Sequence, residues 1–306
     1  MEIRAIRDDE HPLAAALVYE ATRGAPADAA GVKGFLDEAR SLGTDLSRQV
    51  VAVTEDATVV ACAMYFPAPD GSAIATRPFC RAEFARTELQ LALMRALCAA
   101  AAADGTRMLQ TFSDEHDVET HHVFVESGFE ELALMLFMER GARDEDRNIT
   151  LDTDIRWIPY APEHEDAFAH AVDASYEGTL DCVRLGVAGR AALSLDTYRA
   201  RGDVDPSLWL LAQIANETVG CLMLLSHPDE NTYEVGYIAV LPKHRGKGLG
   251  RKVMERGLFE VASRSLDAKL TLAVDESNVP AVNMYRALAF VVTDRKRVHF
   301  SLLATV

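Results

Sequence analysis

The sequence lacks the features that mark a secreted or membrane-spanning protein. Its five cysteines are scattered singly without a Cys-x-x-Cys pair, which argues against a disulfide framework and against a zinc site of the usual spacing. The alanine-rich stretch at 96–103 is about half as long as a transmembrane helix requires. The first residues, MEIRAIRDDEHP, lack the cationic flank and apolar segment of a secretory signal. We therefore expect a soluble, cytoplasmic protein with no membrane partner.

Basic residues are also scarce relative to acidic ones. The chain has 31 Lys and Arg against 47 Asp and Glu, a net charge of −16. Such an acidic surface repels phosphate backbones, so we expect no nucleic-acid partner unless basic residues cluster locally. The 306 residues are enough for two domains of about 150 residues each.

An internal repeat, with copies about 160 residues apart, divides the chain into two halves. The strand-like segment at 50–67 resembles the one at 210–228. Similarly, DEHDV leads from Asp114 to Phe129, and DESNV leads from Asp275 to Phe290 over the same distance. The repeat predicts the same order of strands and helices in both halves, which is an α/β (α+β) fold.

The segment between the halves, residues 141–154, is polar and dense in charge, which is typical of a linker. We therefore predict one domain at 1–147 and a second at 148–306.

A glycine-rich turn in the second half lies between an expected strand and an expected helix. It reads RGKGLG at 245–250, and apolar residues follow it at helical spacing. Glycines let backbone N–H groups approach a phosphate, and a helix N-terminus adds a positive dipole. The turn lies in the most basic stretch of the chain (Lys243, Arg245, Lys247, Arg251 and Lys252). A phosphate-binding turn is favoured; the alternative is an ordinary strand-to-helix loop with a solvated basic face. Walker and Rossmann glycine spacings are absent.

Two motifs of the second half occur together in a known family. One is V-x-P-x-x-R-G-x-G-x-G at 240–250, and the other is N-x-x-A-x-x-x-Y-x-x-x-G-F at 278–290, with Ala289 in place of the glycine. In this order they resemble the conserved blocks of the GNAT superfamily of acetyl-CoA-dependent N-acetyltransferases. The resemblance covers about 153–306 and extends weakly to the first half through the repeat, as in tandem enzymes of the mycothiol synthase type.

The resemblance implies two tandem GNAT-like domains, each with a mixed, largely antiparallel central sheet flanked by helices. It also implies acetyl-CoA as co-substrate, and no metal. The pyrophosphate would contact the turn and the pantetheine arm would pair with the preceding strand. The cofactor-binding residues so implied are Ile238, Ala239, Val240, Arg245, Gly246, Lys247, Gly248, Leu249, Gly250 and Asn278. Separately, we expect Asn278 to cap the helix that follows it, with Pro280 in its first turn.

Two side chains match catalytic positions of the family. Tyr285 corresponds to the tyrosine that protonates the departing CoA thiolate, and the alternative is a ring that packs on the sheet. Glu234 corresponds to the general base of the mycothiol synthase type, and the alternative is a strand carboxylate facing solvent. Strict alternation places Glu234, Gly236, Ile238 and Val240 on one face of the strand. The sequence does not decide which face lines the cleft.

The resemblance implies an acceptor site in the segment 175–205, whose polar candidates are Tyr176, Glu177, Asp181 and Arg184. Glu177 and Asp181 are equally consistent with binding an amine and with being surface charges.

The first half has lost the phosphate turn. Where the second half has glycines, the first reads RAEFAR at 81–86, with Phe84 at the Gly248 position and Glu83 beside it. Phe124 replaces Tyr285. We therefore expect a degenerate domain without acetyl-CoA. His116, His121 and His122 suggest a metal, but a structural role at a helix start is favoured.

The function expected from these features is transfer of an acyl group from CoA directly to the primary amine of a small molecule. The alternatives are a protein or peptide N-acetyltransferase and a non-catalytic acyl-CoA-binding or scaffold protein. A further alternative gives the first half an interaction role, as a platform for a homodimer or for the second domain.

Overall fold

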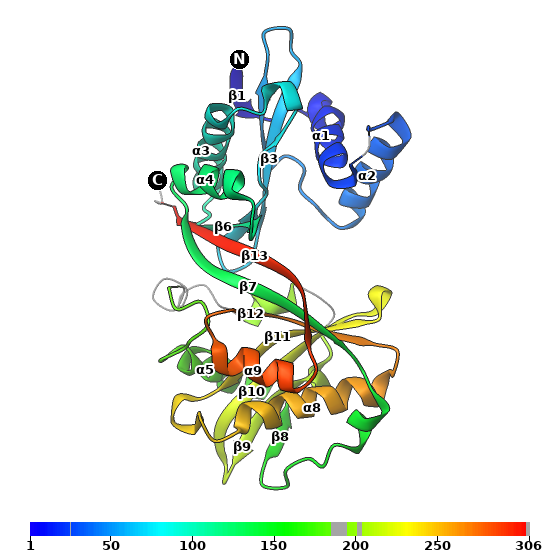
Figure 1. Ribbon diagram of the computed structural model, residues 1–306, viewed down its shortest axis with the longest axis vertical. Helices are drawn as coiled ribbons and strands as arrows, with labels where there is room; N and C mark the ends of the chain where they lie inside the picture. The colour runs from blue at the N-terminus through cyan, green and yellow to red at the C-terminus, as the bar shows by residue number, and fades with distance from the viewer. Residues whose placement is uncertain (25, 185–194, 201–203, 304–306) are drawn as a thin grey trace. The chain divides into compact units, whose positions relative to one another are not determined.

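The computed structural model describes residues 1–24, 26–184, 195–200 and 204–303, and the chain divides into two compact units (Figure 1). The first unit contains Met1–Glu131 and Arg297–Val306, and the second contains Leu132–Lys296. Each has a mixed sheet flanked by helices, which confirms the predicted fold class. No helix among the described residues has the length and apolar character that crossing a membrane requires.

The sheet of the second unit has the strand order β8-β9-β10-β11-β12-β7. These strands are β8 (Arg156–Pro159), β9 (Trp209–Ile214), β10 (Glu217–His227), β11 (Thr232–Val240), β12 (Lys269–Asp275) and β7 (Glu130–Gly141). Its helices are α5 (Glu165–Ser175), α7 (Leu195–Arg199), α8 (Leu249–Arg264) and α9 (Val279–Ala287). Short 3₁₀ turns are η3 (Asp144–Asn148), η4 (Pro162–His164), η5 (Pro206–Leu208), η6 (Pro228–Glu230) and η7 (Pro242–His244).

The sheet of the first unit repeats this order as β1-β2-β3-β4-β6-β13. Its strands are β1 (Glu2–Ala5), β2 (Gln49–Val53), β3 (Val59–Pro67), β4 (Ser72–Ala75), β6 (Met108–Asp114) and β13 (Val291–Leu302), and β5 (Phe79–Cys80) pairs with β3. The helices are α1 (His11–Arg23), α2 (Ala29–Ser41), α3 (Thr87–Ala103) and α4 (Val118–Glu126), with 3₁₀ turns η1 (Asp8–Glu10) and η2 (Ala82–Phe84). In this order β4 corresponds to β11, β6 to β12, α3 to α8 and α4 to α9.

The last strands of the two halves are exchanged. β7 follows α4 along the chain but pairs with β12 in the second unit, from Met135↔Asp275 to Gly141↔Lys269. β13 follows α9, and its last residues belong to the first unit beside β6. The units therefore divide at 131/132 and at 296/297, whereas the sequence predicts one boundary at 147/148. The difference arises because β7 and β13 are long uninterrupted strands that each continue into the other unit.

The segment expected to be a linker packs on the second unit. Arg140, the residue before this segment, donates to the carboxylate of Asp146 within it at 2.6 Å, and both side chains are buried. Arg147 Nε also donates to the carbonyl oxygen of Ala262 at the end of α8, at 2.9 Å. These two contacts hold the segment in place on the second unit. Breaking the buried ion pair would leave an uncompensated charge in the interior, which is costly.

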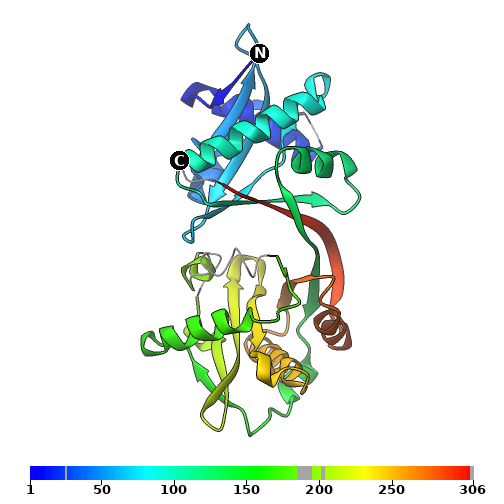
Figure 2. The same ribbon diagram turned by 90° about the vertical axis from the view of Figure 1, so that its left-hand side faces the viewer.

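Helices cover both faces of the second unit's sheet (Figures 1 and 2). One core cluster joins the sheet to α8 and α9 and includes Val253, Leu258 and Tyr285. The other joins the opposite face to α5 and α7 and includes Phe168, Tyr198 and Trp209. The functional side chains considered below are therefore assigned to one of two faces, the α8 face or the α5 face.

Candidate functional site

Two parallel strands of the second unit pair at their beginnings and then part. The register of β11 with β12 runs from Thr232↔Lys269 to Glu234↔Thr271, although β11 continues to Val240 and β12 to Asp275. On its other edge β11 stays paired with β10 as far as Val240↔Gly220. The parting leaves a wedge between the two strands, with Glu234 at its narrow end.

A β-bulge changes the predicted faces of β11. Met223 is opposite Tyr237 and Leu224 is opposite Val235, so Gly236 is the extra residue. The bulge reverses the alternation, and strict alternation was therefore a wrong prediction. Beyond the bulge, Ile238 and Val240 pack on the α8 face.

Glu234 lies on the other face of β11. It is directly opposite Leu225, whose side chain belongs to the α5-face core, and residues opposite one another in antiparallel strands share a face. Tyr237 and Ala239 pack on the same face. The side chain of Glu234 is 25% exposed, and its Oε2 lies 3.4 Å from His227 Nε2.

The glycine-rich turn joins β11 to α8. Gly246 and Gly248 have φ values of +74° and +78°, a left-handed conformation that side chains disfavour, and a Cβ at either would have no atom within 4 Å. Gly248 is the N-cap of α8, a helix of 16 residues. The first N–H groups of a helix have no partners within it, so they are available to an anion at the wide end of the wedge. The turn lies between a strand and a helix as the sequence predicts, and its binding of a phosphate stays a prediction.

The guanidinium of Arg245 hydrogen-bonds to backbone carbonyls of β11 and of the segment after α5. Nε donates to the carbonyl of Val240 at 2.9 Å, and Nη1 donates to the carbonyls of Glu177 and Gly178 at 2.8 and 2.9 Å. Nη2 donates to the carbonyl of Ser175 at the end of α5. The side chain of Arg245 thus joins the end of β11 to the segment after α5, and its backbone belongs to the turn.

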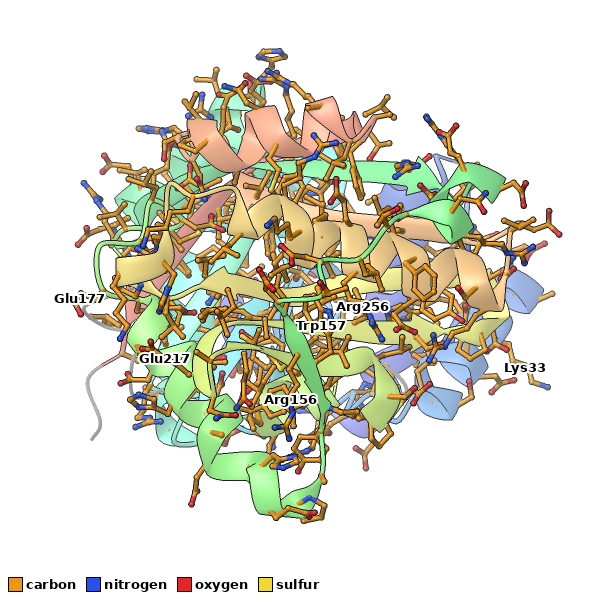
Figure 3. All side chains as sticks on the ribbon, turned by 90° about the horizontal axis from the view of Figure 1, so that it is seen from below. Lys33, Arg156, Trp157, Glu177, Glu217 and Arg256 are labelled. Atoms are coloured by element: carbon orange, nitrogen blue, oxygen red, sulfur yellow. The ribbon has the colours of Figure 1, made fainter. Side chains whose placement is uncertain are left out.

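Several basic side chains around the turn are paired with carboxylates. Lys243 and His244 contact Glu217 (labelled in Figure 3), Arg251 donates to Glu255 at 2.7 Å, and Lys252 donates to Asp152. Lys247 Nζ instead donates to the carbonyl of Lys243 at 3.0 Å. The basic stretch is therefore less of a free positive patch than the sequence indicates.

Tyr285 is buried on the α8 face, 4% exposed, with its ring 5.8 Å from that of Phe290. Burial raises the pKa of its phenol well above the ordinary value, and the carboxylate of Asp181 raises this pKa further. The phenol is therefore protonated at neutral pH, the state that a proton donor requires.

The helix that carries Tyr285 begins as predicted. Asn278 Oδ1 accepts the backbone N–H of Ala281 at 3.4 Å, and Pro280 lies in the first turn, which confirms the predicted cap. Ala289, at the family's glycine position, has φ +64°. The counterpart in the first unit is Gly128, with φ +94°. The backbone conformation explains why glycine is usual there.

Asp181 and Asp275 form a reciprocal clamp that sequence reasoning missed. Asp181 Oδ1 accepts the backbone N–H of Asp275 at 2.9 Å, and Asp275 Oδ2 accepts the backbone N–H of Cys182 at 3.0 Å. Burial raises the pKa of Asp181. The clamp fixes the segment after α5 at the end of β12, so Asp181 is not a surface charge. In the sequence, Asp275 is noticeable only because Asp114 stands at the equivalent position of the repeat, and that match gives no indication of the clamp.

The remaining acceptor candidates lie in different environments. Tyr176 and Tyr198 pack against Tyr237, whose hydroxyl lies 2.6 Å from Ser175 Oγ. Burial raises the pKa of Tyr176 to about 12. Glu177 (labelled in Figure 3) and Arg184 are exposed. The rest of the predicted acceptor segment, residues 185–194 and 201–203, lies outside the described residues.

A pocket of about 370 Å³ opens on the flank of α8, lined by Thr150, Leu151, Asp152, Thr153, Ile155, Trp157, Lys252 and Glu255. Arg256 lies over the Trp157 ring, 5.5 Å from its centroid (Figure 3). The lining does not include the glycine turn, Glu234 or Tyr285, so we assign this pocket no part in the reaction.

The corresponding region of the first unit lacks both the wedge and the turn. All four residues of β4 pair with β6, from Ser72↔Met108 to Ala75↔Thr111. The loop before α3 has no positive φ, and Phe84 packs against the core. Phe124, fully buried, occupies the position of Tyr285.

Comparisons with known proteins point to one family. Residues 165–290 match the model of the Acetyltransferase (GNAT) family. A mycothiol acetyltransferase of Streptomyces griseus subsp. griseus is 34% identical over 96 residues, 31% of this chain and 31% of that protein. One of Thermobispora bispora is 38% identical over 91 residues, 28% of this chain and 30% of that protein. An N-alpha-acetyltransferase 30 of Xenopus laevis is 29% identical over 101 residues, 32% of this chain and 37% of that protein. The chain thus matches about a third of the length of these curated relatives.

Solved structures with the same fold extend over both units. A GCN5-related N-acetyltransferase from Sphaerobacter thermophilus has a TM-score of 0.66 and 18% identity, covering 99% of this chain and 95% of that chain. A tandem GNAT protein from the clavulanic acid biosynthesis pathway has a TM-score of 0.59 and 16% identity, covering 99% and 98%. At these identities the likeness shows the fold, which is that of a tandem.

Proposed function

We propose that this chain, whose residues 165–290 form an acetyltransferase domain of the GNAT family, transfers an acetyl group from acetyl-CoA directly to the primary amine of a small molecule. The observation that carries the proposal is the wedge between β11 and β12, which opens beside the glycine-rich N-terminus of α8. A nucleotide cofactor with a pyrophosphate and a long thin arm suits such a site, because one end binds anions and the other is a strand edge.

In the proposed complex the backbone N–H groups of residues 245–250 hold the pyrophosphate. The pantetheine arm pairs with β11 at residues 238–240, which β12 leaves unpaired, and the thioester then points towards the narrow end of the wedge. The left-handed Gly246 and Gly248 shape the turn without side chains that would keep a phosphate away. Asn278 lies at the start of α9, at the end of β12.

The two catalytic roles follow from the environments of the side chains. Glu234, partly exposed at the narrow end, takes a proton from the ammonium group of the acceptor, directly or through water. The freed amine attacks the thioester carbon, and the thiolate of CoA leaves. Tyr285, held protonated by burial, donates its proton to that thiolate, and the second proton that the attacking nitrogen loses as the amide forms restores the phenol through water. No covalent enzyme intermediate is needed.

The acceptor would enter beside the segment after α5. Tyr176 and Tyr198 pack against Tyr237 there, and aromatic rings suit a cationic amine. The matched relatives named mycothiol acetyltransferase support a small acceptor. The match to an N-alpha-acetyltransferase 30 supports a second candidate, acetylation of a peptide N-terminus.

The proposed function is tested by assaying release of free thiol from acetyl-CoA with a panel of small primary amines and of peptides with free N-termini. Turnover with a small amine supports the first candidate, and turnover only with peptides supports the second. Calorimetric titration should give one acetyl-CoA per chain. Binding without turnover on either panel would leave a non-catalytic acyl-CoA-binding protein, and two equivalent sites would contradict the degenerate role of the first unit.

A further inference from the structure

Three side chains of metal-ligand type meet in the first unit. His121 comes from α4, Glu131 from the start of β7 and His299 from the end of β13. His121 Nδ1 lies 2.9 Å from His299 Nε2 and 3.8 Å from Glu131 Oε2. One potential ligand atom from each residue lies within 4.8 Å of the others.

This cluster differs from the run of histidines in the sequence. Along the chain, His116, His121 and His122 suggest a group, but His116 has a 92% exposed side chain and His122 is also exposed. The structure instead brings His121 together with His299, which is 178 residues further along the chain. The exchange of β13 into the first unit supplies this third element, and so the sequence alone could not indicate the cluster.

We propose that His121 Nδ1, His299 Nε2 and Glu131 Oε2 bind one divalent transition-metal ion, with Zn²⁺ as the best match. Zinc takes histidine nitrogens and carboxylate oxygens at about 2.0–2.2 Å, which in a tetrahedral site places neighbouring ligand atoms about 3.3 Å apart. The observed separations of 2.9 and 3.8 Å lie on either side of that value. The ligand atoms of His299 and Glu131 lie within 4.8 Å of each other, so side-chain rotations that move these atoms by on the order of an ångström would complete the site.

The protonation state of His299 suits a ligand. Its side chain is fully buried, and burial lowers the pKa of the imidazole to about 4, so the ring is neutral at neutral pH. Its ring also lies 5.2 Å from that of Phe124, which helps to hold the ring in place. The two imidazoles now share one hydrogen between them. On metal binding that hydrogen moves to the far nitrogen of its own ring, so both facing nitrogens present lone pairs and no proton is lost.

The surroundings orient the Glu131 carboxylate and leave one side of the cluster open. Arg297 Nη1 donates to both oxygens of Glu131 at 3.1 and 3.0 Å and orients this carboxylate. A carboxylate has about four lone-pair directions, so Oε2 can accept from Arg297 and bind an ion together. The side chains of His121 and Glu131 are 32% and 36% exposed, which gives an ion an entry path and leaves a position for water.

The experiment uses the full-length chain, stripped of metal with a chelator that is then removed. Zn²⁺ is titrated in competition with a chromophoric chelator, and Co²⁺ is added separately to report the coordination geometry by its visible absorption. We expect one equivalent of Zn²⁺ per chain, a rise in melting temperature with Zn²⁺ concentration, and a tetrahedral Co²⁺ spectrum. His121→Asn and Glu131→Gln should each weaken Zn²⁺ binding at least tenfold.

The matched control is His122→Asn, the exposed histidine next along the same helix. It should leave the affinity for Zn²⁺ unchanged, because its side chain is outside the cluster. Because His121 and Glu131 are partly exposed, their variants should keep the far-ultraviolet circular dichroism of the parent chain. The proposal is overturned if the parent chain binds no Zn²⁺, or if His122→Asn weakens binding as much as His121→Asn. The measurements are independent of acetyl transfer, so they stand whatever the outcome for the proposed function.

Discussion

The imidazole of His227 lies 3.4 Å from the carboxylate of Glu234, where β11 and β12 part. His227, at the end of β10, is diagonal to Glu234 across the pair of strands, because Thr232 is its direct partner. Both side chains are partly exposed, at 30% and 25%. A proton that reaches the carboxylate therefore has an exit to solvent through an imidazole, the side chain best suited to relay protons near neutral pH.

Glu234→Gln tests the base. Glutamine keeps the shape of the side chain but cannot accept a proton, so kcat/KM should fall by roughly two to four orders of magnitude, with acetyl-CoA affinity retained. The acidic limb of the rate profile should flatten. Glu230→Gln, an exposed neighbour in η6, serves as the control and should behave as the parent. If Glu234→Gln releases thiol at the same rate as the parent chain, Glu234 is not the general base and is only a partly exposed charge.

Tyr285→Phe tests the acid. Turnover should fall by roughly one to three orders of magnitude while acetyl-CoA still binds, because the ring remains and only the proton donor is lost. Folding should tolerate the change, since Phe124 already fills the matching position of the first unit. Burial raises the pKa of Tyr285, so we expect no loss of rate from its ionisation up to about pH 10. Full turnover of this variant on its acceptor would show that Tyr285 is not the proton donor and contributes only to packing.

Gly248→Ala tests the phosphate turn, with Gly105→Ala as a matched control. Both glycines have positive φ, +78° and +84°, and at both a Cβ has no atom within 4 Å. Each variant should therefore lose about 1 kcal/mol of stability from backbone strain alone. Titration calorimetry should show weaker acetyl-CoA binding for Gly248→Ala only. Equal affinities in the two variants would place the pyrophosphate elsewhere.

Local features of the site could be predicted from the sequence. The glycine-rich turn, the cap at Asn278 and the apolar stripe of α8 each depend on a few neighbouring residues, and the structure agrees with each. The repeat also predicted two similar units, because both halves carry the same order of elements. The roles of Glu234 and Tyr285 stay predictions that only the variants test.

Other features depend on residues that are distant in sequence. The bulge at Gly236 depends on how β10 pairs with β11, so alternation along one strand could not show it. The clamp between Asp181 and Asp275 joins a loop to a strand 94 residues away. The exchange of β7 and β13 follows from which sheet edge each strand joins, and the polar segment at 141–154 therefore marked a chain connection rather than the division of the units.

Ala289→Gly and Gly128→Ala form a reciprocal pair. Ala289 has φ +64° and Gly128 has φ +94°, at equivalent positions after α9 and α4. Glycine adopts this conformation without the steric cost that alanine carries, so Ala289→Gly should gain about 1 kcal/mol of unfolding free energy. Gly128→Ala should lose a similar amount. Urea unfolding followed by circular dichroism measures both, and a loss of stability in Ala289→Gly would contradict the strain argument.

The acid sensitivity of the first unit should depend on His299. Burial lowers the pKa of its imidazole from 6.5 to about 4, with nearby His121 and Arg297 acting in the same direction and Glu131 opposing them. Between these values the unfolded chain binds about one more proton than the folded chain, so stability falls as the pH falls from 6.5 towards 4. In metal-free buffer, His299→Phe should remove that part of the slope. His116→Gln, which changes an exposed histidine, should preserve it. If urea unfolding at several pH values gives the same slope for His299→Phe as for the parent, the buried imidazole does not control the acid response.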